Sequence, residues 1–260
     1  MADRAATSFV EVAGIRLEVV RIGRGRPLLL LYGEEALELE PPFLDLLSAE
    51  RALIIPSPPG FGRSERPDWV TNPDDIAYLY LELLDRLGLR GIDVLGCSLG
   101  GWIALEMATK DAAAFARMVL AAPYGARFGA PDEPEIADIW MLHPATVTKL
   151  KWFDPAKAER DYKSMSEDAL AIIARNSESF ARFCWEPYLH MPKLRHRLQR
   201  VTTRTLFVWG ENDGIVTPAY GRTMAKHVPG ARLAVIGQAG HYPHLEQPQA
   251  FMGHLRSFLD

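Results

Sequence analysis

The stretch that decides the fold covers residues 92–108 and reads IDVLGCSLGGWIALEMA. Its first residues are mostly apolar, which is typical of a buried strand, and the residues after Gly101 have a helical pattern. Between the two lies the pattern G-x-S-x-G, with Ser98 at its centre. A strand, this pattern and a helix together predict a sharp turn that holds the Ser98 hydroxyl above the sheet. A Cβ at Gly96 or Gly100 would clash in so tight a turn. The amides at the start of the helix favour a negative charge that develops beside Ser98.

Two later strand-like segments end in the groups that a serine nucleophile needs. Residues 205–209 lead into a loop with Asp213, and residues 233–236 lead into a loop with His241. The carboxyl ends of parallel strands share one edge of a sheet, so we expect these side chains to meet Ser98 there. His241 would be the base and Asp213 the group that orients it.

His244 is an alternative base, three residues further along the chain. We favour His241 because it directly follows a glycine and a strand end, whereas His244 is predicted to begin the last helix. The cluster of His241, His244 and Glu246 could resemble a metal site. We expect no metal there, because no second set of ligands is present.

The rest of the chain predicts an α/β fold with a mostly parallel sheet. Short apolar runs alternate with helical patterns, and most runs are continuous, as in strands covered on both faces. A helix over residues 73–87 has Asn72 as its cap, Pro73 at its first position and Gly88 at its end. Residues 9–12 and 15–21 predict a hairpin. The apolar runs cover residues 28–32, 52–55, 92–95, 118–122, 205–209 and 233–236.

The alternation stops between residues 124 and 200, where helical patterns occur without a clear strand. We interpret residues 124–200 as a helical cap inserted into a core made of residues 1–123 and 201–260. A separate helical domain is the alternative. No Gly/Ser-rich linker flanks the segment, so we favour the cap.

These features together resemble the α/β-hydrolase family. The order Ser, Asp, His along the chain is that of the family. Three further stretches match it: residues 59–64 (PGFGRS), 210–218 (GENDGIVTP) and 240–248 (GHYPHLEQP). The resemblance covers residues 9–123 and 201–260. It implies an eight-stranded, mostly parallel sheet with helices on both faces and a helical cap.

Two positions differ from the family pattern. The family's His-Gly after the third strand is Tyr32-Gly33 here, followed by Glu34 and Glu35, and its Asp before the PGFG loop is Ser57. The resemblance implies an oxyanion hole made of the backbone amides of Leu99 and Glu34. If the side chain of Glu34 or Glu35 faces Ser98, it opposes an oxyanion and disfavours acidic substrates. Glutamate is rarely buried unpaired, so we expect both to point to solvent.

The substrate pocket is predicted only in outline. Cap aromatics are expected to line an apolar pocket. Arg182 or Arg195 is a weaker candidate for binding a substrate carboxylate from the cap. The candidate pocket residues are Tyr32, Glu35, Trp140, Trp185 and Tyr242.

Composition excludes several classes of protein. The chain has 260 residues, of which 48% are hydrophobic and 24% charged, so it is globular in composition. A net charge of −4 argues against a nucleic-acid partner. Two cysteines without a CxxC pair favour a reducing compartment. The first residues show no signal-peptide pattern and no apolar run has membrane length. We expect a cytoplasmic monomer or homodimer that needs no cofactor.

The sequence therefore predicts a carboxylesterase-like serine hydrolase. It would cleave an ester, thioester or lactone of a small, fairly apolar molecule through an acyl-enzyme. A hydrolase that cleaves C–C bonds of ring-cleavage products is an alternative, because Tyr242 and the size of the cap suit that branch. A non-catalytic binding protein of the same fold is a second alternative, suggested by the changes at Tyr32, Glu34 and Glu35.

Overall fold

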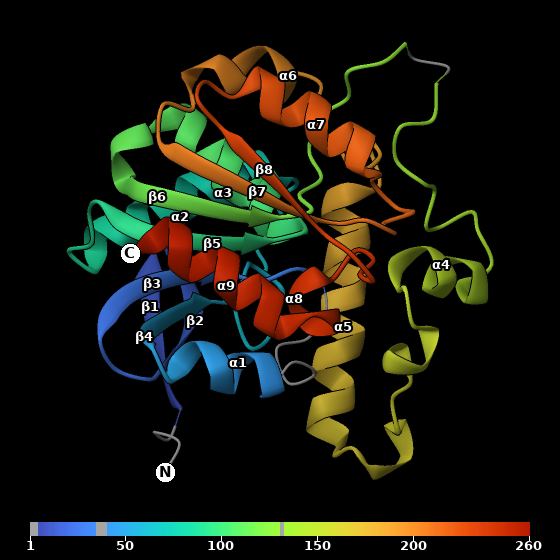
Figure 1. Cartoon of the computed structure of the whole chain (residues 1–260). Coiled ribbons are helices and arrows are strands. Elements are labelled where there is room, and N and C mark those ends of the chain that lie inside the picture. The colour runs from blue at the N-terminus through green and yellow to red at the C-terminus, as the bar shows by residue number, and fades with distance from the viewer. Residues whose placement is uncertain (1–4, 35–40, 131–132) are drawn as a thin grey trace.

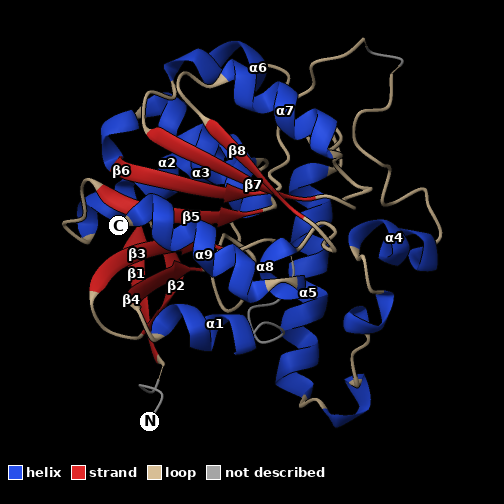
Figure 2. Cartoon of the chain, in the orientation of Figure 1, coloured by secondary structure: helices blue, strands red, loops and turns tan. Residues whose placement is uncertain are grey.

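The computed structural model describes residues 5–34, 41–130 and 133–260. Within them eight strands form one sheet in the order β1-β2-β4-β3-β5-β6-β7-β8 (Figure 1, Figure 2). β1 and β2 form an antiparallel hairpin, β2 also pairs antiparallel with β4, and the remaining pairs are parallel. The predicted α/β-hydrolase fold with a mostly parallel eight-stranded sheet is confirmed. The strands are β1 (Ala6–Val12), β2 (Ile15–Ile22), β3 (Arg26–Leu31), β4 (Arg51–Pro56), β5 (Ile92–Cys97), β6 (Phe115–Ala121), β7 (Arg204–Gly210) and β8 (Arg232–Ile236).

Helices cover both faces of the sheet, and each face has its own apolar core. On β3, Leu29 and Leu31 belong to the core that includes α2 and α3, whereas Leu28 and Leu30 belong to the core that includes α1 and α9. This alternation follows from the period of two along a strand. Strands with two covered faces need apolar residues at every position, which explains the continuous runs. The helices are α1 (Pro41–Ser48), α2 (Pro73–Arg86), α3 (Leu99–Lys110), α4 (Pro144–Lys151), α5 (Glu167–Cys184), α6 (Leu194–Arg197), α7 (Pro218–His227), α8 (Pro243–Glu246) and α9 (Pro248–Leu259), and short 3₁₀ turns cover Ala112–Ala114, Pro155–Ala158, Tyr162–Ser164 and Leu198–Arg200.

The signals that predicted α2 act as expected. The side chain of Asn72 accepts the backbone N–H of Asp75 at 3.1 Å, Pro73 occupies the first position, and Gly88 follows the helix with a φ of 65°. A cap of this kind contributes about 1 kcal/mol to helix stability.

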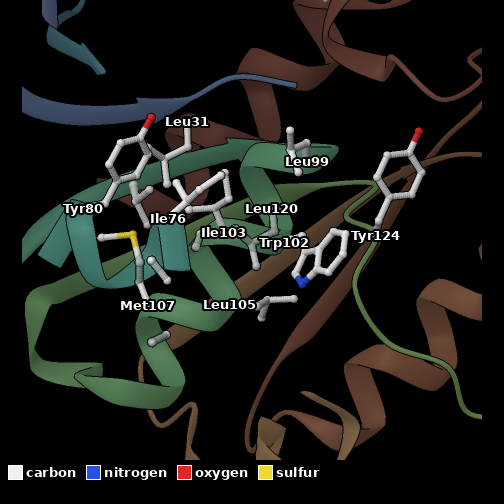
Figure 3. Close-up of a cluster of buried hydrophobic side chains, with 14 of the residues drawn as sticks. Leu31, Ile76, Tyr80, Leu99, Trp102, Ile103, Leu105, Met107, Leu120 and Tyr124 are labelled. Carbon is white, nitrogen blue, oxygen red and sulfur yellow. The ribbon is translucent and has the colours of Figure 1, made fainter. Parts of the chain in front are cut away.

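α3 carries the turn that follows β5, and it is buried from Leu99 to Thr109. Figure 3 shows Trp102 and Ile103 of α3 gathered with Ile76 and Tyr80 of α2 in one apolar cluster. Burial of each large apolar side chain contributes about 1.5–3 kcal/mol. The packing of α3 therefore fixes the turn at its amino end.

Residues 124–200 connect β6 to β7, and their described part contributes no strand to the sheet. Figure 1 shows α4 and α5 beside the edge at which the parallel strands end. α5 is bonded to the loop of residues 59–64: Arg175 Nε donates to the carbonyl of Gly60 at 3.0 Å, and the N–H of Gly62 donates to Asn176 Oδ1 at 2.9 Å. The segment is thus attached to the sheet's loops by polar contacts as well as by apolar packing.

Candidate active site

Ser98 stands at the turn between β5 and α3, with φ of 49° and ψ of −114°. A residue with a Cβ rarely adopts positive φ, and such strain is typical of a nucleophile elbow. The neighbouring glycines make the turn possible. A Cβ on Gly100 would lie 2.0 Å from the carbonyl oxygen of Leu31, and one on Gly96 would lie 2.8 Å from Gly101 Cα. The predicted order of strand, turn and helix is present.

The side chains of Ser98, His241 and Asp213 form a continuous hydrogen-bonded chain. Ser98 Oγ lies 2.9 Å from His241 Nε2, and His241 Nδ1 lies 2.9 Å from Asp213 Oδ2. All three residues are buried. Asp213 Oδ1 accepts the backbone N–H groups of Ile215 and Val216 at 2.9 and 3.1 Å, which fixes the carboxylate. This arrangement lets the imidazole take a proton from Ser98 while Asp213 sets the orientation of the ring.

Two contacts hold His241, one at its backbone and one at its ring. The backbone N–H of His241 donates to the carbonyl oxygen of Lys151 at 2.6 Å. The ring of Tyr124 stacks on the imidazole, with centroids 5.0 Å apart and planes 22° apart. Tyr124 follows the end of β6, so it reaches the site from the same sheet edge. Burial, with the charge of Glu34, raises the pKa of the Tyr124 phenol well above its ordinary value.

Glu246 ties the His241 loop to the end of α4. Its carboxylate accepts the backbone N–H of Gly240 at 2.6 Å and those of Phe153 and Asp154 at 3.2 and 3.0 Å. Each charge-assisted bond of this kind is stronger than a neutral one. One buried side chain thus connects the loop that carries His241 to the segment that carries Lys151.

The carboxylate of Glu34 lies against the Ser98 hydroxyl. Its Oε2 accepts from Ser98 Oγ at 2.8 Å. Its Oε1 accepts from Lys151 Nζ at 2.8 Å, from Tyr242 OH at 2.8 Å and from Tyr124 OH at 3.3 Å. Three side chains from three different segments therefore donate to one oxygen.

The pKa of Glu34 is set by opposing effects. Burial raises it, but the positive charge of Lys151, the neighbourhood of His241, the Lys151 hydrogen bond and the backbone N–H of Glu34 itself lower it. The lowering effects prevail, and the pKa of this carboxyl lies well below its ordinary range. Glu34 is therefore a carboxylate at neutral pH.

The expectation that Glu34 points to solvent is wrong. The residue is only 8% exposed. The expectation assumed that a buried glutamate would have no partner, and Lys151 supplies that partner. Glu35 lies outside the described residues.

The other predicted pocket residues occupy different places. Tyr242 is buried, and its hydroxyl is bonded to Glu34 and Lys151. Tyr32 is also buried, but its hydroxyl donates to Ser57 Oγ at 3.2 Å. Trp140 packs edge-on against Trp185, which is half-exposed, with ring centroids 5.5 Å apart. Tyr242 is therefore connected to Ser98 through the Glu34 carboxylate.

His244 lies apart from the Ser98 hydroxyl, in an aromatic cluster. Its ring packs edge-on against Phe43 at 5.0 Å and tilts against Phe251 at 5.7 Å. In residues 5–34, 41–130 and 133–260, no group of three or more His, Cys, Asp or Glu side chains is placed to hold a metal ion. Arg182 is paired with Asp68 at the surface, 3.2 Å apart.

Sequence reasoning missed Lys151 and Tyr124. Tyr124 lies two residues beyond the apolar run 118–122, so the rule that placed Asp213 and His241 could have found it. Lys151 carries no such signal. It ends a short helix of the 124–200 segment and is 117 positions from Glu34.

Known proteins resemble this chain in sequence and in fold. Residues 32–253 match the model of the alpha/beta hydrolase family. The chain is 27% identical to the 2-hydroxymuconate semialdehyde hydrolase of Pseudomonas putida, over 95% of this chain and 92% of that protein. It is 30% identical to the pimeloyl-[acyl-carrier protein] methyl ester esterase of Neisseria meningitidis serogroup C, over 65% of this chain and 69% of that protein.

The fold is also that of solved structures. The meta-cleavage product hydrolase of Pseudomonas fluorescens IP01 matches with a TM-score of 0.77 at 21% identity, over 97% of each chain. In the described part of this chain no helix has the length and apolar character needed to cross a membrane.

Proposed function

The chain belongs to the alpha/beta hydrolase family, and from that premise we propose that it is a serine hydrolase of carboxylic esters, thioesters or lactones. The observation that carries the proposal is the hydrogen-bonded chain from Ser98 through His241 to Asp213. A strained, buried serine beside a histidine that is itself oriented by a carboxylate is the arrangement of an activated nucleophile.

The reaction begins when Ser98 Oγ attacks the acyl carbon of the substrate. His241 Nε2 takes the hydroxyl proton, and Asp213 stabilises the imidazolium that forms. The amides of Leu99 and Glu34 hold the oxyanion of the tetrahedral intermediate. His241 then gives its proton to the leaving group, an acyl-enzyme remains on Ser98, and a water activated by His241 releases the acid.

The Ser98 hydroxyl has one proton and two acceptors near it. Glu34 Oε2 lies at 2.8 Å and His241 Nε2 at 2.9 Å. Attack requires that the proton pass to His241, which can return it to the leaving group. In the productive state the hydroxyl is therefore directed to His241 and away from Glu34.

We place the substrate between the sheet edge and residues 124–200, which would act as a cap. Polar contacts of α5 and of the backbone near Lys151 with the sheet's loops support that role. Of the proposed pocket residues, Trp140 and Tyr242 are connected to the site by contacts: Tyr242 is bonded to Glu34, and Trp140 is connected to His241 through two aromatic rings. Trp140 packs on Phe180, Phe180 stacks on Tyr124, and Tyr124 stacks on the base.

A second candidate reaction is hydrolysis of a C–C bond. It is favoured by the likeness to the 2-hydroxymuconate semialdehyde hydrolase, which extends over 95% of this chain. Ser98, His241 and Asp213 would have the same roles in this reaction. The leaving group would be a carbon atom, which must be protonated, where an ester has an alcohol. A non-catalytic binding role is the third possibility, and it predicts that Ser98 can be replaced without loss of function.

The first test is hydrolysis of p-nitrophenyl esters of two to eight carbons in the burst phase, with Ser98→Ala beside the wild type. We expect a burst in the wild type and loss of turnover in Ser98→Ala. Ser177→Ala, which changes a serine on the exposed face of α5, is the control and should keep full activity. A fluorophosphonate probe should add its mass to the peptide that contains Ser98.

The outcomes separate the candidates. If no ester is turned over but 2-hydroxymuconate semialdehyde loses its visible absorbance in a Ser98-dependent way, the C–C reaction replaces the proposed one. If neither substrate reacts and the fluorophosphonate leaves Ser98 unmodified, the serine is not an activated nucleophile and the hydrolase proposal fails.

A further inference from the structure

The side chains that donate hydrogen bonds to Glu34 form an anion-binding site. Lys151 comes from the end of α4, Tyr124 follows β6, and Tyr242 precedes α8. All three donate to Glu34 Oε1. Lys151 also donates to Tyr242 OH at 2.8 Å, so the donors support one another. Only 12% of the Lys151 side chain is exposed, which makes its charge count for more than a surface charge.

The Glu34 carboxylate, which occupies this site, blocks access to the hydroxyl of Ser98, the proposed nucleophile. Glu34 Oε2 is 2.8 Å from Ser98 Oγ, on the hydroxyl that must reach a substrate carbonyl. The backbone N–H of Glu34, one of the two proposed oxyanion donors, also stabilises the same carboxylate. A carbonyl group that is to be attacked needs this donor and this space. The Glu34 side chain must therefore move aside before the reaction.

We propose that Lys151, Tyr124 and Tyr242 form a carboxylate subsite for the substrate, which Glu34 fills while no substrate is bound. The proposal rests on the serine hydrolase function above and narrows its substrate class. One carboxylate group spans the distance from Ser98 Oγ to Lys151 Nζ with its two oxygens. The substrate carboxylate thus lies close to the scissile carbonyl, and we place it on the acyl side of the ester.

Charge balance explains the preference. A substrate carboxylate that takes the place of the Glu34 carboxylate restores beside Lys151 the negative charge that the movement of Glu34 removes. A neutral substrate also displaces the Glu34 carboxylate from Lys151 but brings no charge to replace it, and weakening the ion pair of a mostly buried ammonium is costly. We expected from the sequence that a carboxylate near Ser98 disfavours acidic substrates. That expectation applies only if the Glu34 side chain stays beside Ser98 when the substrate binds.

Two matched pairs of methyl esters test the proposal. Monomethyl malonate and methyl acetoacetate differ only by a carboxylate in place of a methyl ketone, and so do monomethyl succinate and methyl levulinate. Hydrolysis is followed by acid release at constant pH. In the wild type we expect kcat/KM for the charged ester to exceed that of its neutral partner by about tenfold or more in at least one pair, as a buried charge-assisted bond would give.

Lys151→Met removes the ammonium and should abolish this preference by lowering kcat/KM for the charged ester about tenfold more than for the neutral ester. Lys149→Met changes an exposed lysine of the same helix and should leave the ratio unchanged. A wild-type preference for the neutral esters would overturn the proposal. So would an equal loss on both esters in Lys151→Met, which would mean that Lys151 serves the oxyanion itself.

A binding measurement keeps the two proposals distinguishable. Succinate is titrated calorimetrically into the wild type, Glu34→Ala and the double variant Glu34→Ala/Lys151→Met. Removal of the internal carboxylate should tighten succinate binding about tenfold, and removal of Lys151 should cancel the gain. If no ester is turned over while this pattern holds, the hydrolase function fails and the subsite stands. If esters are turned over and Glu34→Ala binds succinate no better than the wild type, the subsite fails alone.

Discussion

The backbone N–H of His241 donates to the carbonyl oxygen of Lys151 at 2.6 Å. The side chain of the same lysine contacts Glu34, so Lys151 meets the site through its backbone and through its ammonium. The proposed base is thus held by a segment that is not part of the sheet. Substitutions that disturb this contact should affect catalysis although they change none of the reacting groups.

Gly240→Ala should disrupt the contact directly. A Cβ at this position would lie 2.3 Å from the carbonyl oxygen of Lys151 and 3.0 Å from Trp152 Cα. We expect a loss of about 1–3 kcal/mol in stability, typical of overpacking, and a fall in kcat/KM of about 100-fold as His241 moves. Gly253→Ala in α9, where the space around the added Cβ is open, should retain activity. Near-normal kcat/KM in Gly240→Ala would contradict the role of the contact.

Asp213→Asn should lower kcat strongly while the fold is retained. The amide cannot stabilise an imidazolium and favours the wrong tautomer of His241, for which a loss of about 10⁴ is typical. Glu211→Gln, in the same loop but exposed, is the matched control and should behave as the wild type. Steady-state kinetics and circular dichroism on both variants provide the check. A loss below about tenfold would argue against Asp213 as the orienting group.

Glu246→Ala should destabilise the protein and weaken catalysis together. Three backbone N–H groups lose their acceptor, and only that of Gly240 makes a fully buried bond. An unmet buried donor costs about 1–3 kcal/mol. Glu246→Gln keeps an acceptor oxygen and should recover part of both losses. Urea unfolding gives the stability, and ester hydrolysis gives kcat/KM. Gln249→Ala, an exposed change nearby, controls for the region. An alanine variant as stable as the wild type would refute the bridging role of Glu246.

Stability should fall as the pH rises through neutrality because of Glu106. Burial raises the pKa of its carboxyl to about 7, with Lys110 opposing and Asp74 adding to the effect. The ordinary value of 4.5 applies when the chain unfolds, so the folded state binds this proton more tightly. The resulting stabilisation is complete below about pH 4.5 and is lost as the pH rises through 7, a change of about 3 kcal/mol at most.

Glu106→Gln should make the free energy of unfolding less dependent on pH between 5 and 8. The quantity to compare is the difference between wild type and variant, measured by urea unfolding at each pH. Glu159→Gln, at an exposed position, should follow the wild-type curve. Equal slopes for the wild type and Glu106→Gln would show that Glu106 does not hold a proton in this range.

The fold could be predicted from the sequence because its signals are local. The strand, turn and helix around Ser98 and the cap of α2 each depend on residues that are neighbours in the chain. The meeting of Ser98, Asp213 and His241 follows from one rule about the ends of parallel strands.

The environment of Glu34 could not be predicted in this way. Its position beside Ser98 depends on Lys151, which lies in a segment whose path over the sheet no periodicity encodes. From the sequence alone we could apply the general rule that burying a carboxylate is costly, but we could not identify Lys151 as the cation that offsets this cost. Because the path of this segment could not be predicted, the pocket was predicted only as a set of candidates, four aromatic residues and Glu35. Of these, Tyr242 is bonded to Glu34 and Tyr32 is bonded to Ser57.

Residues 150–154 are bonded to His241 and to Glu246. These bonds limit where segments of this chain can be exchanged with those of a relative. A chimera that exchanges residues 124–200 for the matching segment of a relative would substitute new backbone for the acceptor of the His241 N–H and for two of the three donors to Glu246, and would shift their positions. We expect the substrate range to change together with the placement of His241, the proposed base. Crossover points that keep residues 150–154 native should separate the two effects and yield active hybrids more often.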